Sequence, residues 1–147
     1  MGRSGLEKLY LRYCYELGYL PKYQQNPTKL HILLKEDLLK CDQYSEQAKL
    51  LSRYHVDTEK DLSDLMESIE GSIKEHSLDR DDFRRTARRV LPESEISDAK
   101  DRIKDLTAEI RELRHELKVC GDIQQRSGHV RENLAAIDRD RLRERVR

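Results

Sequence analysis

Apolar residues recur along the chain at intervals of three and four, which is the periodicity of helices rather than of strands. The first apolar face runs from Leu6 to Leu17, and Gly18 is expected to cap the C-terminal end of that helix. The segment Tyr19 to Pro27 is rich in turn-forming residues and predicts a loop. A second helix is then expected to run unbroken from Thr28 to Tyr54 and to pack against the first.

A third helix is expected to begin at Thr58, because Thr58 and Asp61 resemble a capping box. Its apolar residues are spaced alternately four and three, as in a heptad repeat. After Pro92 this spacing resumes without a miss over 25 positions. The predicted seam consists of Leu62, Met66, Ile69, Ile73, Phe83, Ala87, Val90, Ile96, Ala99, Ile103, Leu106, Ile110, Leu113, Leu117 and Cys120.

A proline separates the two heptad stretches, so they cannot form one continuous helix. We therefore expect an antiparallel coiled-coil hairpin over residues 58–120, with its turn near residues 91–95. In this register the polar residue His76 lies opposite Ile110. His76 either lies in the seam and fixes the register at some cost in stability, or it lies at the solvent-exposed edge of the seam.

Past residue 120 the apolar spacing changes register, in a stretch that contains two glycines. Ile123 to Ile137 is expected to pack back on the N-terminal helical pair of residues 1–57. The arginine-rich end, Arg139 to Arg147, is expected to fray, and the chain looks cut there rather than finished. The predicted fold class is all-α: a helical base of residues 1–57 and a C-terminal helix over 121–147, with a projecting coiled-coil hairpin.

Composition excludes several classes of protein. Charged residues make up 39% of the chain, mean hydropathy is −0.92, and net charge is zero, so neither one large core nor a uniformly basic nucleic-acid binder is indicated. A run of about 18 apolar residues, which a membrane span would need, does not occur in the sequence. The start, MGRSGLEKLY, lacks the apolar core of a signal peptide. The sequence therefore predicts a cytoplasmic protein without a membrane partner.

Residues suited to metal binding or catalysis are scattered. The cysteines are odd in number and widely spaced, which fits reduced thiols better than a disulfide framework or a zinc site: Cys14, Cys41 and Cys120. The histidines stand singly, at His31, His55, His76, His115 and His129. Glycine-rich phosphate loops and standard hydrolase motifs are absent from the sequence. We therefore expect no catalytic residue, metal, cofactor or small-molecule substrate.

Two clusters suggest contact with nucleic acid, and each has a structural alternative. Tyrosines in the first 23 residues, with basic neighbours, could stack on single-stranded bases, although the helical spacing of Tyr10 and Tyr13 favours a place in the core. A basic block near the predicted hairpin tip could contact phosphate groups. Acidic residues at the start of the facing arm could instead neutralise that block. The block consists of Arg84, Arg85, Arg88 and Arg89.

Three segments carry a family resemblance: LYLRYCYELGYLPK (Leu9 to Lys22), LHILLKEDLLKCDQYSEQAKLLSRYH (Leu30 to His55) and ELRHELKVCGDIQQRSGHVR (Glu112 to Arg131). Their sequences resemble the carboxy-terminal region of relaxases, the mobilisation nucleases of conjugative elements in Gram-positive bacteria. The predicted hairpin between these segments is similar to that region in its hydrophobic pattern, though its sequence is variable.

The resemblance implies a part in DNA transfer. A full relaxase cuts one DNA strand with a nucleophilic tyrosine and a metal held by clustered histidines. No two histidines here lie within ten residues of each other, so no catalytic residue is carried over. The expected function is a non-catalytic accessory segment that contacts DNA or proteins of the transfer complex. The alternative is a coiled-coil protein–protein interaction module with no nucleic-acid role.

Overall fold

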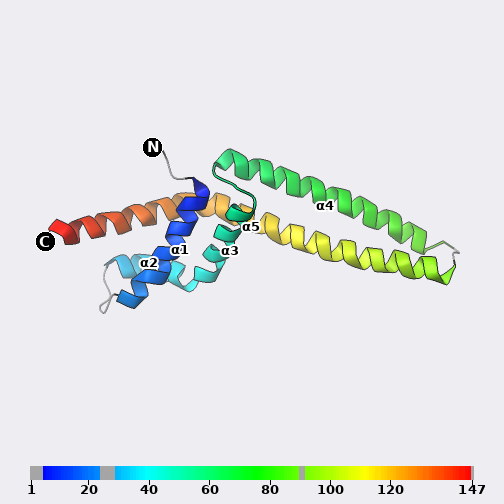
Figure 1. The fold of residues 1–147 in the computed structure, drawn as a ribbon, viewed down its shortest axis with the longest axis horizontal. Helices are drawn as coiled ribbons and strands as arrows, with labels where there is room; N and C mark the ends of the chain where they lie inside the picture. Colours follow the sequence, from blue (N-terminus) through cyan, green and yellow to red (C-terminus); the bar gives the residue numbers. More distant parts are fainter. Residues whose placement is uncertain (1–4, 24–28, 90–91, 147) are drawn as a thin grey trace. The chain divides into compact units, whose positions relative to one another are not determined.

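The computed structural model describes residues 5–23, 29–89 and 92–146, and all secondary structure in these ranges is helical. The predicted all-α fold class is confirmed for this part of the chain. In chain order the helices are α1 (Leu6–Tyr23), α2 (Lys29–Leu39), α3 (Cys41–Arg53), α4 (Glu59–Ala87) and α5 (Glu93–Val146) (Figure 1).

The chain divides into two compact units. Unit 1 comprises Met1–Leu62 and Val119–Arg147, and unit 2 comprises Ser63–Lys118. Helix α5 is continuous and contributes to both units, so residues 121–146 continue the second arm of the hairpin as one helix. Glycine costs a helix interior only about 1 kcal/mol, which α5 tolerates at the two glycines near the change of register. Helix also extends to Val146, where a frayed end was expected.

Helix α1 passes the predicted cap at Gly18 and ends at Tyr23, so the expected loop from Tyr19 was wrong over its first residues. Side-chain contacts one turn apart explain the extension. Tyr19 stacks on Tyr15 with ring centres 5.8 Å apart, and the Arg141 guanidinium lies 5.9 Å from the Tyr19 ring centre. Such contacts favour helical backbone where local sequence alone predicts a stop.

The single helix expected between Thr28 and Tyr54 is in fact two helices. They meet at Lys40, whose backbone angles are φ −104° and ψ 19°. The Lys40 amide donates to the Asp37 carbonyl at 3.0 Å, and the Tyr44 amide donates to the Lys40 carbonyl at 3.1 Å, so a new hydrogen-bond ladder starts there. Packing fixes this break, because the flanking Asp37 and Tyr44 side chains are both buried in unit 1.

The predicted capping box at the start of α4 is confirmed. The Asp61 amide donates to Thr58 Oγ1 at 3.0 Å, and the Thr58 amide donates to Asp61 Oδ2 at 3.3 Å. Ahead of this cap, His55 adopts a left-handed backbone conformation with φ 53°. The Asp57 carbonyl then accepts a 2.7 Å hydrogen bond from the Leu6 amide, which joins the start of α1 to the start of α4.

The core of unit 1 is built from α1, α2, α3 and the second half of α5, from Val119 onward. Tyr13 and Tyr44 meet edge to face with ring centres 5.1 Å apart. The Tyr10 hydroxyl donates to the Ile123 carbonyl at 3.1 Å, so burial of this phenol leaves its polar group satisfied. The largest fully buried side chains of unit 1 are Leu6, Tyr10, Tyr13, Leu17, Leu34, Tyr44, Leu51, Leu62, Ile123 and Ile137.

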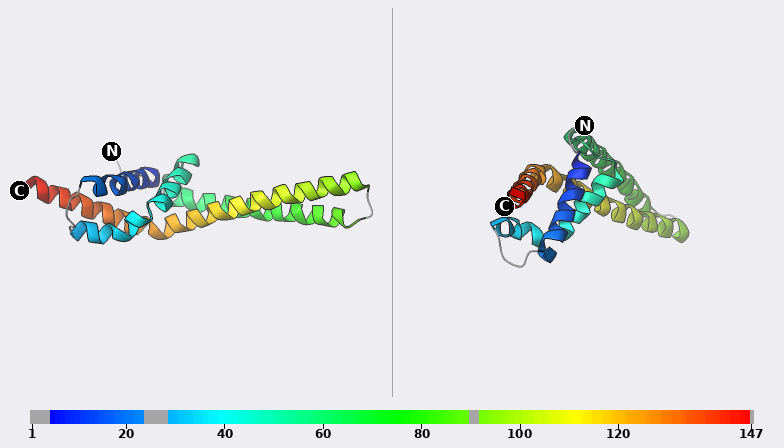
Figure 2. Two further views of the ribbon diagram at one scale, coloured as in Figure 1. Left: turned by 90° about the horizontal axis from the view of Figure 1, so that it is seen from below. Right: turned by 60° about the vertical axis from the view of Figure 1, so that its left-hand side comes forward.

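Unit 2 is a helical hairpin in which α4 and α5 run antiparallel, side by side (Figures 1 and 2). Helix α4 continues unbroken through Ser77. His76 Nε2 lies 3.1 Å from Glu109 Oε2, one residue from the predicted partner Ile110. With its side chain 30% exposed, His76 lies at the wet edge of the seam rather than inside it.

The turn of the hairpin is shifted from the predicted position. Helix α5 already begins at Glu93, and the Pro92 carbonyl accepts hydrogen bonds from the amides of Glu95 and Ile96 at 3.0 and 3.2 Å. Of the predicted seam, Val90 lies outside the described residues. The buried members are Leu62, Ile69, Ala99, Leu106, Ile110 and Cys120. The half-buried members are Met66, Ile73, Phe83, Ala87, Ile96, Ile103, Leu113 and Leu117.

Candidate functional site

A buried carboxylate, Asp37 on α2, lies at the centre of a polar cluster in unit 1. Its Oδ2 atom accepts hydrogen bonds from the Tyr13 hydroxyl, from His129 Nε2 at 2.7 Å and from Asn133 Nδ2 at 3.3 Å. Arg126 lies 3.8 Å from Oδ1 and also donates to the Tyr44 hydroxyl at 3.3 Å. We call this group the Asp37 cluster; its members are Tyr13, Asp37, Tyr44, Arg126, His129 and Asn133.

Hydrogen bonding keeps the Asp37 carboxylate charged. Burial alone would raise its pKa, but the hydrogen bonds from Tyr13 and His129 outweigh burial and hold the pKa below its ordinary value. Burial raises the pKa of Tyr44 to about 12 and also raises the pKa of Tyr13. Tyr13 therefore stays protonated and remains a donor to Asp37.

The Asp37 cluster connects helices, and its carboxylate and its Tyr13 hydroxyl are buried. Tyr13 is fully buried and the Asp37 side chain is 3% exposed, whereas the His129 side chain is 43% exposed. A nucleophilic tyrosine would need access to substrate, which Tyr13 lacks. Because its members come from α1, α2, α3 and α5, the cluster fixes these four helices against one another.

A second buried carboxylate, Glu16 on α1, is held by α5. Arg141 binds it with both guanidinium NH groups, one of them at 2.8 Å from Oε1. Glu16 is 2% exposed, and a two-point pairing with arginine satisfies both of its oxygens. Nearby, Arg12 pairs with Asp138 at the surface. Helices α1 and α5 are thus joined by ion pairs as well as by the apolar core.

The predicted phosphate-binding arginines lie at one end of the hairpin in unit 2. Arg84 and Arg85 occupy the last turn of α4, and Arg88 and Arg89 follow it; all four are exposed. Arg84 lies 3.7 Å from Asp81, and Arg85 lies 3.3 Å from Asp82, each on its own helix. For Arg88 and Arg89, no ion pair is found within the ranges that the structure describes.

The tyrosines near the N-terminus divide as their spacing suggested. Tyr10 and Tyr13 are fully buried, which confirms the prediction of a core role for both. Tyr15 and Tyr19 are on the surface, 64% and 37% exposed, and their rings stack on each other. Surface tyrosines are therefore limited here to a single stacked pair among the described side chains of α1.

Neither a metal site nor a membrane span emerges from the described part of the chain. Over residues 5–23, 29–89 and 92–146, no group of three or more histidine, cysteine, aspartate or glutamate side chains could hold a metal ion. None of the three cysteines forms a disulfide, and burial, with nearby Cys41, raises the pKa of Cys14 to about 11. In the same ranges no helix is apolar enough over a sufficient length to cross a bilayer.

Sequence reasoning missed the Asp37 cluster because its members lie far apart. Tyr13 and Asn133 are separated by 120 residues, and His129 is far from every other histidine in the sequence. One signal was present in the pattern. Asp37 falls three residues after Leu34, and Asn133 three residues after Val130, so each is a polar residue on an apolar helix face.

The members of the Asp37 cluster come from three segments that are distant along the chain. Five of its six residues lie within Leu9–Lys22, Leu30–His55 or Glu112–Arg131. Segments that are distant along the chain therefore meet in unit 1. Comparisons with protein-family models, with curated proteins and with solved structures found no match to this chain.

Proposed function

We propose that this chain is a non-catalytic accessory segment of a conjugative relaxase, which contacts DNA through the arginines at the end of the hairpin. The observation that carries the proposal is the exposure of Arg84, Arg85, Arg88 and Arg89 together at that end. Within the described ranges, Arg88 and Arg89 have no carboxylate partner that a phosphate would have to displace. Guanidinium groups bind phosphate oxygens in pairs and suit a sugar–phosphate backbone.

The partners of Arg84 and Arg85 do not prevent this contact. Both arginines pair with aspartates one turn earlier on α4, and all of these side chains are about half exposed or more. Exposed pairs of this kind contribute only about 0.3–0.5 kcal/mol. Exchange of such a weak partner for a DNA phosphate is therefore not opposed by a large loss of stability.

The hairpin is proposed to be a two-stranded coiled coil that holds the arginines in place. Support comes from the heptad spacing of both arms and from the burial of Ile69, Leu106 and Ile110 along the seam. The resemblance of the flanking segments to relaxases connects this DNA contact with strand transfer. Proteins of the transfer complex are further proposed partners.

The experiment is fluorescence anisotropy of the full chain with labelled single-stranded and duplex DNA at 50 and 200 mM salt. Four released counterions would weaken binding roughly 50- to 150-fold over this range. The test variant reverses Arg84, Arg85, Arg88 and Arg89 to glutamate. The control reverses four exposed basic residues on α5 of the same unit: Lys100, Lys104, Arg111 and Arg114.

The DNA-contact proposal requires the test variant to lose salt-dependent affinity while the control retains it, with helix content equal by circular dichroism. Equal losses in both variants would show diffuse attraction to a charged helix pair. Absence of binding by the unaltered chain at 50 mM salt would remove DNA contact from the proposal altogether.

A second candidate function is recruitment of a partner helix by the hairpin. It is favoured by the eight half-buried apolar residues of the seam, two of which are Met66 and Phe83. A third helix packed along the seam would cover these side chains. Analytical ultracentrifugation with a candidate partner, repeated with Met66→Ser and Phe83→Ser, would separate this function from the first, because neither substitution touches the arginines.

A further inference from the structure

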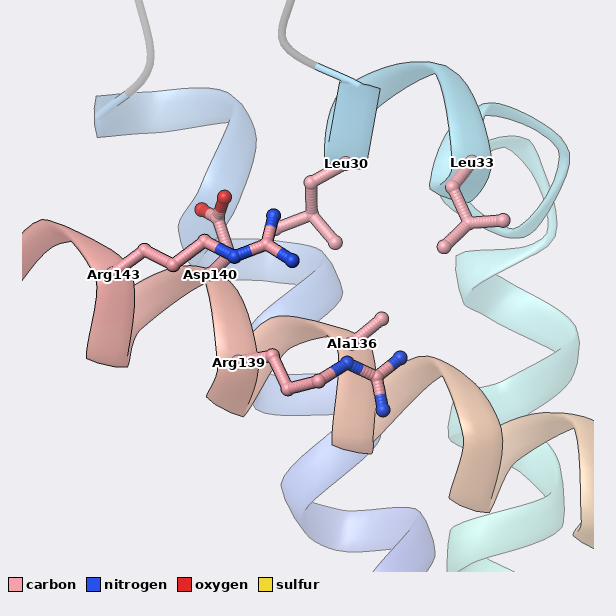
Figure 3. A pocket seen from close by; sticks show the side chains of 6 residues that line it. All are labelled: Leu30, Leu33, Ala136, Arg139, Asp140 and Arg143. Carbon is pink, nitrogen blue, oxygen red and sulfur yellow. The ribbon is translucent and has the colours of Figure 1, made fainter.

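A groove lies between α2 and the C-terminal part of α5 in unit 1 (Figure 3). Its volume is about 310 Å³, at the small end of ligand-binding cavities in proteins. Helix α2 supplies apolar side chains, and α5 supplies mainly charged ones. The lining residues are Leu30, Leu33, Ala136, Arg139, Asp140 and Arg143.

The apolar side of the groove is incompletely covered. Of the two leucines that line it, Leu30 is 7% exposed, but Leu33 leaves 53% of its surface in solvent. On the same short helix, Ile32 and Leu39 are 70% and 83% exposed. Burial of apolar surface contributes about 25 cal/mol per Å² of favourable free energy, so a complex in which a partner covers Leu33 would be stabilised by that burial.

The charged side of the groove contains two arginines, Arg139 and Arg143. Four arginines elsewhere in unit 1 pair with carboxylates: Arg12 with Asp138, Arg126 with Asp37, Arg131 with Glu59 and Arg141 with Glu16. No such pair is found for Arg139 or Arg143 among the residues that the structure describes. Both are exposed, and together they outnumber the single acidic residue of the groove, Asp140.

The spacing of these residues matches the surface of a helix. Leu30 and Leu33 are three residues apart on α2, and Arg139 and Arg143 are four apart on α5. Residues at these separations are neighbours on one helix face, about 5–6 Å apart at their Cβ atoms. A helix lying along the groove would present its own side chains at the same intervals, apolar ones toward the leucines and acidic ones toward the arginines.

We propose that this groove docks an amphipathic helix of a partner protein, with an apolar stripe that contacts Leu33 and flanking carboxylates that pair with Arg139 and Arg143. The positive charges of the two arginines favour a partner helix with acidic side chains beside its apolar stripe. The leucines of α2 favour apolar side chains in the stripe itself. This interaction goes beyond the proposed DNA contact, since it uses unit 1 and residues outside the hairpin arginines.

The test uses the full chain and a fluorescein-labelled synthetic helical peptide of 18 residues, with leucines on one face and glutamates flanking them. Anisotropy at 50 mM salt is expected to show saturable binding. Affinity should fall at least about tenfold for Arg139→Ala with Arg143→Ala, and similarly for Leu33→Ser. The matched control, Arg102→Ala with Arg111→Ala, removes two exposed arginines of unit 2 and should leave affinity unchanged.

Two further peptides make the result decisive. One carries lysine in place of each glutamate, and the other carries serine in place of each leucine; neither should bind. Absence of binding by the acidic peptide up to 1 mM would overturn the proposal, as would equal affinity for the lysine peptide. Retention of full affinity by the groove variants would do so too. The quadruple Arg84, Arg85, Arg88 and Arg89 reversal should bind the peptide normally, so failure of the DNA proposal leaves this result interpretable.

Discussion

His129 and Asp37 are 92 residues apart in the sequence, yet His129 Nε2 lies 2.7 Å from Asp37 Oδ2. This contact joins α5 to α2, and Tyr13 and Asn133 complete the hydrogen bonding of the same carboxylate oxygen. A buried charge is tolerated only when its partners are in place. Stability of unit 1 should therefore depend on the charge of Asp37 and on each partner.

Acid should destabilise unit 1 through Asp37. Its pKa in the folded protein is held below the ordinary value of about 3.9, so the stabilisation is present above pH 4 and is lost as pH falls through the folded pKa. Asp37→Asn should remove this dependence and lower the free energy of unfolding at pH 7 by about 2 kcal/mol. Urea unfolding at pH 7, 5, 4 and 3 measures both effects. A variant with the same acid sensitivity as the unaltered chain would contradict the assignment.

Removal of the Tyr13 hydroxyl should be costly. It donates to Asp37 and accepts from Asn133 Nδ2 at 2.9 Å, so Tyr13→Phe leaves two buried polar groups short of a partner. We expect a loss of about 1–2 kcal/mol in thermal or urea unfolding. Tyr15→Phe is the matched control, because Tyr15 is 64% exposed and should change stability by less than about 0.5 kcal/mol. Equal effects of the two substitutions would argue against the cluster.

The register of the hairpin can be tested by a cross-link. Arg80 donates to Thr107 Oγ1 at 3.4 Å and His76 contacts Glu109, which places Ile73 near Leu113 on the facing helix. With Cys14, Cys41 and Cys120 replaced by alanine, Ile73→Cys with Leu113→Cys should oxidise to an intramolecular disulfide, seen as a mobility shift on non-reducing gels. Ile73→Cys with Leu106→Cys, two turns out of register, should remain reduced. Faster oxidation of this second pair would refute the register.

Gly71 in the middle of α4 offers a gain in stability. It is exposed, and a Cβ atom built there would meet no atom within 4 Å. Gly71→Ala should therefore raise the free energy of unfolding by about 0.5–1 kcal/mol, because alanine loses less backbone entropy in a helix. Gly5→Ala provides the contrast. A Cβ there would come within 2.8 Å of Asp57 Oδ1, so this substitution should destabilise.

Local sequence predicted the parts of this fold that depend on local interactions. The heptad spacing and the Thr58 capping box are features of neighbouring residues, and the hairpin and the start of α4 follow from them. The break at Lys40 could not be predicted in this way. Neither proline nor glycine is present there, and the break depends on packing in unit 1.

The polar clusters escaped prediction for a similar reason. Asp37 acquires its partners from α1 and α5, and no motif of fixed spacing links residues that far apart. Helix α1 was predicted too short because Tyr19 is stabilised by Arg141, a residue more than a hundred positions away. Polar residues on apolar helix faces, such as Asp37 and Asn133, were the available signal.

Unit 1 is formed by two segments that are far apart in the sequence, and this has a consequence for its folding during synthesis on the ribosome. The contacts of the hairpin are local, as between Arg80 and Thr107, which are 27 residues apart, so the hairpin can close early in a nascent chain. Unit 1 must wait, because Asn133 is translated 120 residues after its partner Tyr13, and Arg141 is translated 125 residues after its partner Glu16. Until then the carboxylates of Asp37 and Glu16 must remain in water, and the N-terminal helices cannot complete their packing.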